Sequence, residues 1–258
     1  QRLLAVPPGI IESGEILLDG EDLLKKKETE MRLIRGKKVA MIFQDPMSTL
    51  NPVFTVGEQL IRIITHNQGL KRNQAREKAL EIIKTVKLPD PANIMVKYPH
   101  ELSGGQRQRI IIAMALVCGA ELIIADEPTR NLDVTIQAGI LKLIKELQDK
   151  FKVTVLFIAN NLGLVSAVCD EIGILKEGQI VERGYVREVL SNPCHEYTKL
   201  LINSITPKQK KEVKPENGQP CILEVKGLKK YYSVGNRYRS RKGLYVKAVD
   251  GVDFTIKQ

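Results

Sequence analysis

Residues 102–109 read LSGGQRQR, and residues 122–128 read LIIADEP. The first stretch predicts a helix that begins beside Ser103, because serine is a preferred N-cap and two adjacent glycines let a ligand approach the backbone closely. The free N–H groups and the dipole at such a helix start favour a phosphate. By itself this stretch is also typical of an ordinary glycine-rich helix cap, so a functional interpretation needs the second stretch as well.

The second stretch is an apolar strand that ends in two adjacent acids, Asp126 and Glu127. Ligands of parallel α/β sheets bind at the carboxyl ends of the strands. We expect Asp126 to hold Mg²⁺, directly or through water, and Glu127 to orient and polarise an attacking water. The alternative interpretation, a strand end followed by an ordinary polar turn, does not require two adjacent acids.

Apolar runs and helical spacing alternate along the chain, which predicts an α/β fold with a largely parallel sheet. A short strand before the turn at Asp19-Gly20 and a hairpin over 172–181 add a small antiparallel region. The predicted buried strands are 39–43, 122–125 and 153–158, the predicted helices are 56–86, 103–118 and 134–149, and residues 45–52 are predicted to be loop.

The same pattern predicts the domain organisation. Residues 1–205 form one domain, in which a helical subdomain at about 45–118 interrupts the sheet. Residues 206–220 are polar, contain three prolines and predict a linker. Strand-like alternation resumes over 221–258, as the start of a new domain would.

Composition is that of a globular protein, with 43% hydrophobic and 27% charged residues. No apolar run reaches the roughly 18–20 residues of a membrane-spanning helix. Most of the net charge of +10 lies in residues 205–258, which hold 13 Lys and Arg against 5 Asp and Glu. A solvated, lysine-rich linker is the favoured interpretation over a nucleic-acid or lipid site. The four cysteines lie far apart, which disfavours a zinc or iron–sulfur site.

The glycine-rich stretch and the acid pair, with Gln44 upstream and Asp133 downstream, resemble the ABC ATPase family over about residues 1–200. Residues 102–106 match the signature motif, residues 122–127 the Walker B strand, Gln44 the Q-loop and Asp133 the D-loop. The resemblance implies a P-loop NTPase-type cassette that binds ATP and Mg²⁺ and hydrolyses ATP. It implies Gln44 and Asp126 as Mg²⁺ ligands, Glu127 as the catalytic residue, and a nucleotide-contacting set of Gln44, Ser103, Gly104, Gly105, Gln106 and Asp133.

Residues 43–52, 98–103 and 192–198 resemble the oligopeptide and dipeptide importer subfamily, and 188–205 its C-terminal tail. The resemblance implies a peripheral ATPase on the cytoplasmic face of the cell membrane that energises peptide uptake. Its partners would be membrane permease subunits, through the helical subdomain and the Q-loop region, and indirectly a solute-binding protein. A nickel importer, a soluble ABC ATPase acting on nucleic acid or ribosomes, and an inactive fragment are the alternatives. The subfamily segments speak against a nucleic-acid partner.

Two departures from the family pattern bear on activity. No GxxxxGK[ST] motif occurs in the 258 residues. Because residues 1–4 resemble the end of the helix that follows this loop, we expect the loop upstream of residue 1 and no ATP hydrolysis by the 258 residues alone. Asn160 occupies the position of the family's switch histidine, which contacts the γ-phosphate. Asparagine is shorter and cannot become cationic, so the resemblance implies a degenerate catalytic position there.

The C-terminal residues resemble the beginning of another cassette. Residues 222–231 are similar to its opening strand, and residues 246–254 to its next strand. Tyr231 is placed like the aromatic residue that stacks on adenine. The sequence therefore predicts the middle of a fused double cassette, in which two cassettes enclose two nucleotides.

Overall fold

The computed structural model describes residues 2–3, 9–205, 220–234 and 244–257. The chain divides into two compact units, Gln1–Thr206 and Pro207–Gln258. The predicted linker lies outside the described residues except for Pro220. Each unit is described by itself.

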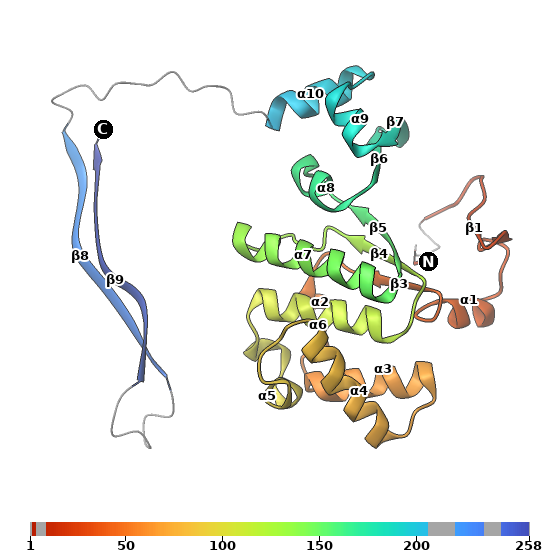
Figure 1. Cartoon of the computed structure of the whole chain (residues 1–258), viewed down its shortest axis with the longest axis horizontal. Helices are drawn as coiled ribbons and strands as arrows, with labels where there is room; N and C mark the ends of the chain where they lie inside the picture. The colour runs from red at the N-terminus through yellow and green to blue at the C-terminus, as the bar shows by residue number, and fades with distance from the viewer. Residues whose placement is uncertain (1, 4–8, 206–219, 235–243, 258) are drawn as a thin grey trace. The chain divides into compact units, whose positions relative to one another are not determined.

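A three-stranded parallel sheet lies at the centre of the first unit (Figure 1). Its strands are β3 (Val39–Ile42), β4 (Leu122–Asp126) and β5 (Thr154–Ile158), in the order β3-β4-β5. The three runs are apolar and rich in β-branched residues, as strands of a parallel sheet usually are. This sheet, with helices packed beside it, confirms the predicted α/β class.

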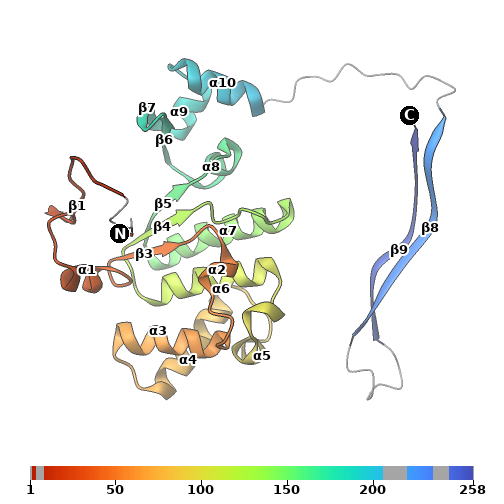
Figure 2. The same ribbon diagram turned by 180° about the vertical axis from the view of Figure 1, so that it is seen from behind.

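One face of the sheet is covered by α6 (Gly104–Val117) and α7 (Val134–Phe151), which run beside it in both Figure 1 and Figure 2. Ile42, Ala125 and Phe157 are neighbours across the three strands and pack into the core on this face. The alternate side chains of β5 point the other way, where Leu156 and Ile158 remain 53% and 46% exposed.

A helical lobe packs against the same core. It consists of α3 (Val56–Gln68), α4 (Arg72–Thr85) and α5 (Pro91–Val96), with a 3-10 turn at Pro99–Glu101. Thr55 and Glu58 form a capping box at the start of α3, and Gly69 ends it in the left-handed conformation. One hydrophobic cluster joins this lobe to the sheet, from Leu60 and Ile64 to Ile123.

Several sequence predictions need correction. The expected loop over 45–52 contains a one-turn helix, α2 (Pro46–Thr49), because Asp45 caps it and proline is favoured at the first helical position. The single helical stretch predicted over 56–86 is two helices, divided at Gly69. The first predicted strand is only β1 (Leu17–Leu18), which pairs with β2 (Glu21–Asp22). The short helices that were not predicted are α1 (Glu28–Ile34), α5, α8 (Leu162–Val168), α9 (Val186–Ser191) and α10 (Glu196–Ile205).

A second, smaller core lies after the sheet. The predicted hairpin is present as β6 (Glu171–Lys176) and β7 (Gln179–Tyr185). Its side chains pack with those of α8 and α9 around Val165, Ile172 and Val186. Among the described residues, no helix of either unit is long and apolar enough to cross a membrane.

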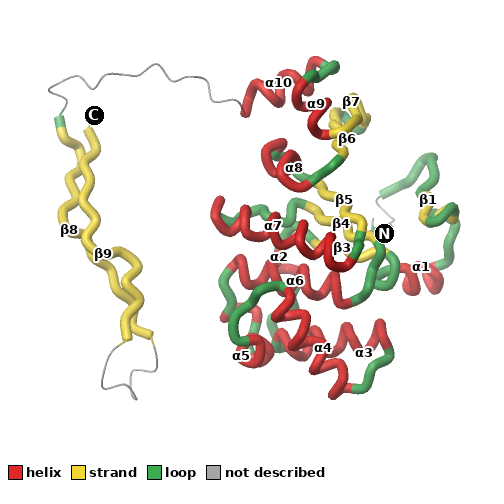
Figure 3. Tube along the Cα trace, viewed as in Figure 1, coloured by secondary structure: helices red, strands yellow, loops and turns green. Residues whose placement is uncertain are grey.

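The second unit contains two long antiparallel strands, β8 (Cys221–Val234) and β9 (Leu244–Lys257), coloured as strands in Figure 3. Large apolar side chains are exposed along both strands, including Ile222, Tyr232 and Phe254. A two-stranded hairpin is at best marginally stable by itself in water. Further burial of these side chains is therefore needed for this unit to be stable.

The packing of α3 predicts that a methyl group added at Gly57 destabilises the fold. A Cβ there meets the carbonyl oxygen of Met95 at 2.6 Å, and backbone cannot move away cheaply. We expect Gly57→Ala to lower the free energy of unfolding by about 1–3 kcal/mol. The matched control is Gly139→Ala in α7, where the nearest atom is Arg109 Nη2 at 3.6 Å. This change should stabilise by about 0.5–1 kcal/mol. Equal urea midpoints for the two variants would contradict the expectation.

Candidate functional site

Gln44 and Glu127 meet at one edge of the sheet. β3 ends at Ile42 and β4 at Asp126, so both side chains emerge where neighbouring parallel strands end. Gln44 Nε2 donates a hydrogen bond of 2.5 Å to Glu127 Oε2, although the residues are 83 positions apart. The strand pairing thus brings together two residues that the sequence placed in separate motifs.

The backbone at Glu127 is unusual. Its φ is +41°, in the left-handed region that non-glycine residues rarely adopt. Two hydrogen bonds hold it there: its N–H donates to Ile158 O at 2.9 Å, and its carbonyl accepts from the Arg130 N–H at 3.0 Å. Backbone of this kind clusters at functional sites, where surrounding structure holds it in place.

Arg130 is a site residue that sequence reasoning missed. Its Nη1 lies 3.1 Å from Glu127 Oε2, the same oxygen that Gln44 contacts. The only signal in the sequence was an arginine three positions after the acid. That spacing becomes a contact because the turn at Glu127 folds the chain back.

Asp126 carries a half-buried carboxylate that makes no hydrogen bond or ion pair with any described residue. The Gln44 side chain donates its nitrogen to Glu127, which leaves its amide oxygen as an acceptor. Mg²⁺ prefers oxygen ligands and commonly takes only one or two from the protein. The residues at this edge therefore fit a magnesium ion.

The glycine-rich stretch opens α6 as the sequence predicts. Ser103 caps the helix: its Oγ accepts from the Gln106 N–H at 3.3 Å, and the Gln106 side chain accepts from the Ser103 N–H at 3.0 Å. Both side chains are thus occupied in capping the helix in this structure. The two glycines between them carry no side chain that could restrict access to the helix start.

Those glycines also have a packing role within the chain. A Cβ at Gly104 would lie 3.2 Å from Leu132 Cδ2, and one at Gly105 would lie 2.8 Å from Ile136 Cγ2. Asp133, between these partners, caps α7 by accepting from the Ile136 N–H at 2.9 Å. The start of α6 and the start of α7 therefore pack closely.

Two separate clusters result. No hydrogen bond or ion pair among the described residues joins Ser103–Gln106 or Asp133 to Gln44 or Glu127.

Asn160 is exposed and lies two residues beyond the end of β5. It comes two positions after Ile158, whose carbonyl accepts from the Glu127 N–H. Its neighbour Asn161 is committed elsewhere. The Asn161 side chain caps α8 by accepting from the Gly163 N–H at 2.8 Å.

Tyr231 lies in the second unit, on β8. Its hydroxyl donates to the Asp250 carboxylate, and Lys247 Nζ contacts the same carboxylate at 2.9 Å. The hydrogen bond to Asp250 raises the pKa of Tyr231 above its ordinary value. Lys247 also lies over the ring, 5.6 Å from its centroid. The side chain is thus held at one end while its ring stays partly exposed.

His195 and Cys118 have structural surroundings. His195 Nδ1 accepts from the Tyr197 N–H at 3.0 Å at the start of α10, and the His195 N–H donates to Glu182. Burial raises the pKa of the Cys118 thiol to about 11, as expected for a core thiol. Within the described parts of the chain, no group of three or more His, Cys, Asp or Glu could hold a metal ion.

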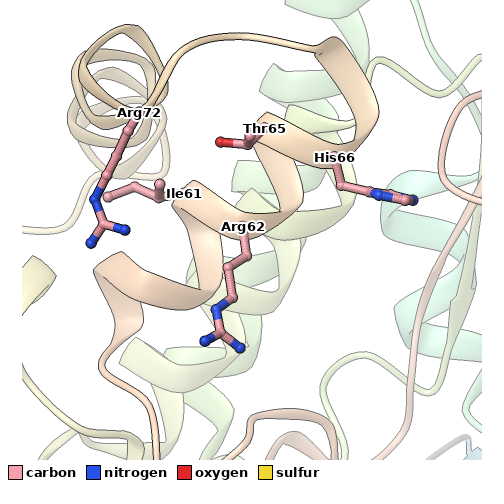
Figure 4. Close-up of a pocket in the computed structure, with 5 residues that line it drawn as sticks. All are labelled: Ile61, Arg62, Thr65, His66 and Arg72. Atoms are coloured by element: carbon pink, nitrogen blue, oxygen red, sulfur yellow. The ribbon is translucent and has the colours of Figure 1, made fainter.

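A hollow of about 360 Å³ lies on the helical lobe, between α3 and the start of α4 (Figure 4). Neither Gln44 nor the acid pair lines it. Arg62 and Arg72 extend from different helices, and Arg62 stacks on the Phe54 ring at 4.0 Å. The hollow is lined by Ile61, Arg62, Thr65, His66 and Arg72. The hollow is therefore a basic surface feature distinct from the acid pair.

A parallel sheet with an acid pair at its carboxyl edge, next to a helix opened by two glycines, defines a nucleotide-binding cassette. The ABC transporter family model matches residues 4–130, and this part of the chain belongs to that family. It is 45% identical over 204 residues to the oligopeptide transport ATP-binding protein OppD of Bacillus subtilis, covering 79% of this chain and 57% of that protein. The resemblance of the sequence to ABC ATPases and to their oligopeptide and dipeptide importer subfamily is thereby confirmed.

Other relatives extend the comparison. The chain is 39% identical over 256 residues to the peptidoglycan transport ATP-binding protein YejF of Agrobacterium fabrum, covering 99% of this chain and 46% of that protein. The chain thus spans about half of the length of these curated relatives. Among solved structures, the ATP-binding cassette MJ0796 bound to ADP and Pi is 29% identical, with a TM-score of 0.60 over 68% of this chain and 75% of that one.

The contact between α6 and α7 predicts coupled effects at Gly105 and Ile136. We expect Gly105→Ala to lower the free energy of unfolding by about 1–3 kcal/mol, because the added methyl meets a β-branched side chain that cannot rotate freely. In an Ile136→Ala background the same change should cost clearly less. A double-mutant cycle of urea midpoints measures the difference. Additive shifts would mean that the glycine does not pack on Ile136.

Proposed function

We propose that the chain forms most of an ATP-binding and ATP-hydrolysing cassette of an ABC importer for oligopeptides or dipeptides. The observation that carries the proposal is the Gln44–Glu127 hydrogen bond at the carboxyl edge of the parallel sheet. Relatives named as oligopeptide and dipeptide transport ATP-binding proteins, each 45% identical to this chain, support the substrate class.

The residues at the sheet edge divide the chemical work. Asp126 and the Gln44 amide oxygen would hold Mg²⁺, which when bound neutralises phosphate charge. Glu127 accepts a hydrogen bond from the attacking water and so orients and polarises it. Held in a fixed position at the strand end, its carboxylate is ready without reorganisation.

The signature cluster serves a nucleotide on an opposing cassette. Ser103–Gln106 makes no hydrogen bond or ion pair with the acid pair among the described residues, and its glycines leave the start of α6 open to a phosphate. Asp133 packs with this cluster and would lie at the same interface. Two cassettes are therefore needed to complete each site, and ATP would be enclosed between them.

A second cassette within the same protein is supported by the hairpin β8–β9. Its exposed apolar side chains call for a larger core, and the similarity to YejF extends over 256 residues, which include this hairpin. Tyr231 is the proposed base-stacking residue of that second cassette. Residues 206–220 are proposed as the linker between the two.

The helical lobe is the proposed contact for membrane permease subunits. The Val56 N–H donates to Lys97 O at 2.9 Å, so the segment before α3 and the end of α5 are adjacent. Both carry exposed apolar side chains, Val53 and Val96, and Met47 of α2 is exposed as well. Such a surface suits a partner helix at the cytoplasmic face of a membrane. A solute-binding protein would act indirectly, and no nucleic-acid partner is proposed.

The proposal predicts that Glu127 is essential for turnover. In a protein where a phosphate-binding loop precedes these residues, Glu127→Gln should reduce ATP hydrolysis roughly 10²–10⁴-fold and leave ATP affinity little changed. The control is Glu146→Gln on α7, which removes a surface ion pair between Glu146 and Lys87. In cells, uptake of a labelled tripeptide should fall with the hydrolysis rate while nickel uptake does not. Unchanged hydrolysis in Glu127→Gln contradicts the proposal.

Asn160 predicts slow turnover at this site. Binding depends on the phosphate loop and Mg²⁺, whereas hydrolysis needs a side chain that reaches the γ-phosphate. With the opposite site disabled, Asn160→His should raise the turnover rate roughly 10²–10³-fold and leave ATP affinity little changed. Asn161 does not replace the histidine, because it caps α8. Asn161→Ala should therefore affect stability more than turnover. Equal rates for the starting protein and Asn160→His would show that the site is already fully active.

A further inference from the structure

The Glu127 carboxylate is contacted by two side chains, and both contact the same oxygen. Gln44 Nε2 lies 2.5 Å from Oε2, and Arg130 Nη1 lies 3.1 Å from the same atom. Within the described residues, no donor reaches Oε1. The carboxylate is therefore held from one side and open on the other.

The local backbone explains how Arg130 comes to lie there. Glu127 adopts the left-handed conformation, and its carbonyl accepts from the Arg130 N–H at 3.0 Å, which closes a tight turn. The turn folds Arg130 back beside the acid that precedes it by three positions. The hydrogen bond from the Glu127 N–H to Ile158 O fixes this turn to the end of β5.

The ion pair is poorly suited to a purely stabilising role. The Arg130 side chain is 54% exposed and that of Glu127 is 18% exposed. Exposed ion pairs contribute little to stability because water and salt screen them. A guanidinium is always charged and its planar N–H groups are directional, so it orients a carboxylate better than a flexible ammonium does.

We propose that Arg130 is a positioning residue for Glu127. Together with the Gln44 amide it fixes Oε2, so that Oε1 faces the attacking water. This inference rests on the proposed function, in which Glu127 orients that water. Arg130 acts through Glu127 and does not itself contact the reacting atoms.

The first test uses the 258-residue chain without nucleotide. NMR measures solvent exchange of the Gln44 side-chain amide protons, which the bond to Glu127 protects. Arg130→Met removes the guanidinium but keeps an unbranched side chain, so the carboxylate should swing away and exchange should quicken severalfold. Glu127→Ala gives the fully unprotected reference. Arg187→Met is the matched control, because Arg187 is an exposed arginine on α9 with no hydrogen bond or ion pair to a described residue.

The second test is kinetic and uses the protein with a phosphate-binding loop present, as for Glu127. Arg130→Met should lower kcat roughly 10- to 100-fold with KM unchanged, since a misplaced catalytic group loses rate rather than binding. Arg130→Lys keeps the charge without the planar group. Its Gln44 amide exchange rate and its kcat should both lie between those of Arg130→Met and those of the starting protein.

The outcomes separate this inference from the proposed function. Gln44 exchange that is unaffected by Arg130→Met overturns the inference, and so does an Arg130→Lys variant no better than Arg130→Met. If Glu127→Gln retains full hydrolysis, the role proposed for Glu127 fails instead. If the starting protein shows no hydrolysis, the amide exchange alone decides whether Arg130 positions Glu127.

Discussion

The parallel pairing of β3 with β4 is the constraint on which the site depends. Ile42 lies opposite Ala125, and beyond this pair both strands end at the same edge of the sheet. Gln44 and Glu127 meet there without any help from sequence proximity. Because side chains alternate between faces, a slip of one position would turn the core-facing side chains Ile42, Ala125 and Phe157 away from α6 and α7. The packing of the core thus fixes the geometry of the acid pair.

Helix α6 links this sheet to the helical lobe. Its buried residues include Ile110, Ile111 and Ile112 in succession, so it is enclosed on nearly all sides. Full burial of each such side chain contributes about 1.5–3 kcal/mol relative to exposure. The start of α6 is therefore held firmly by the core behind it. A glycine-rich helix start that is exposed to a ligand can keep its shape only because the rest of the helix is anchored in this way.

Sequence reasoning succeeded where a local pattern decides the structure. Apolar runs located all three strands, and Ser103 marked the start of α6. It could not find the contact between Arg130 and Glu127, which depends on a left-handed residue in a turn that has no glycine. It assigned α2 to a loop because the segment is rich in Pro, Ser and Asn, although Asp45 followed by proline is also a helix start. The short helices α8 and α9 are stabilised mainly by packing in the second core, which no short window of sequence reveals.

The close fit of Gly105 against Ile136 also bears on how this sequence can change over time. The two positions occupy one small volume, so they are not free to vary separately. A larger side chain at 105 becomes tolerable only after position 136 has lost bulk, whereas the smaller side chain at 136 can come first at modest cost. The same order applies to Gly104 and Leu132. In lineages of this protein, the smaller side chain at 136 is thus expected to appear before the larger side chain at 105, and rarely after it.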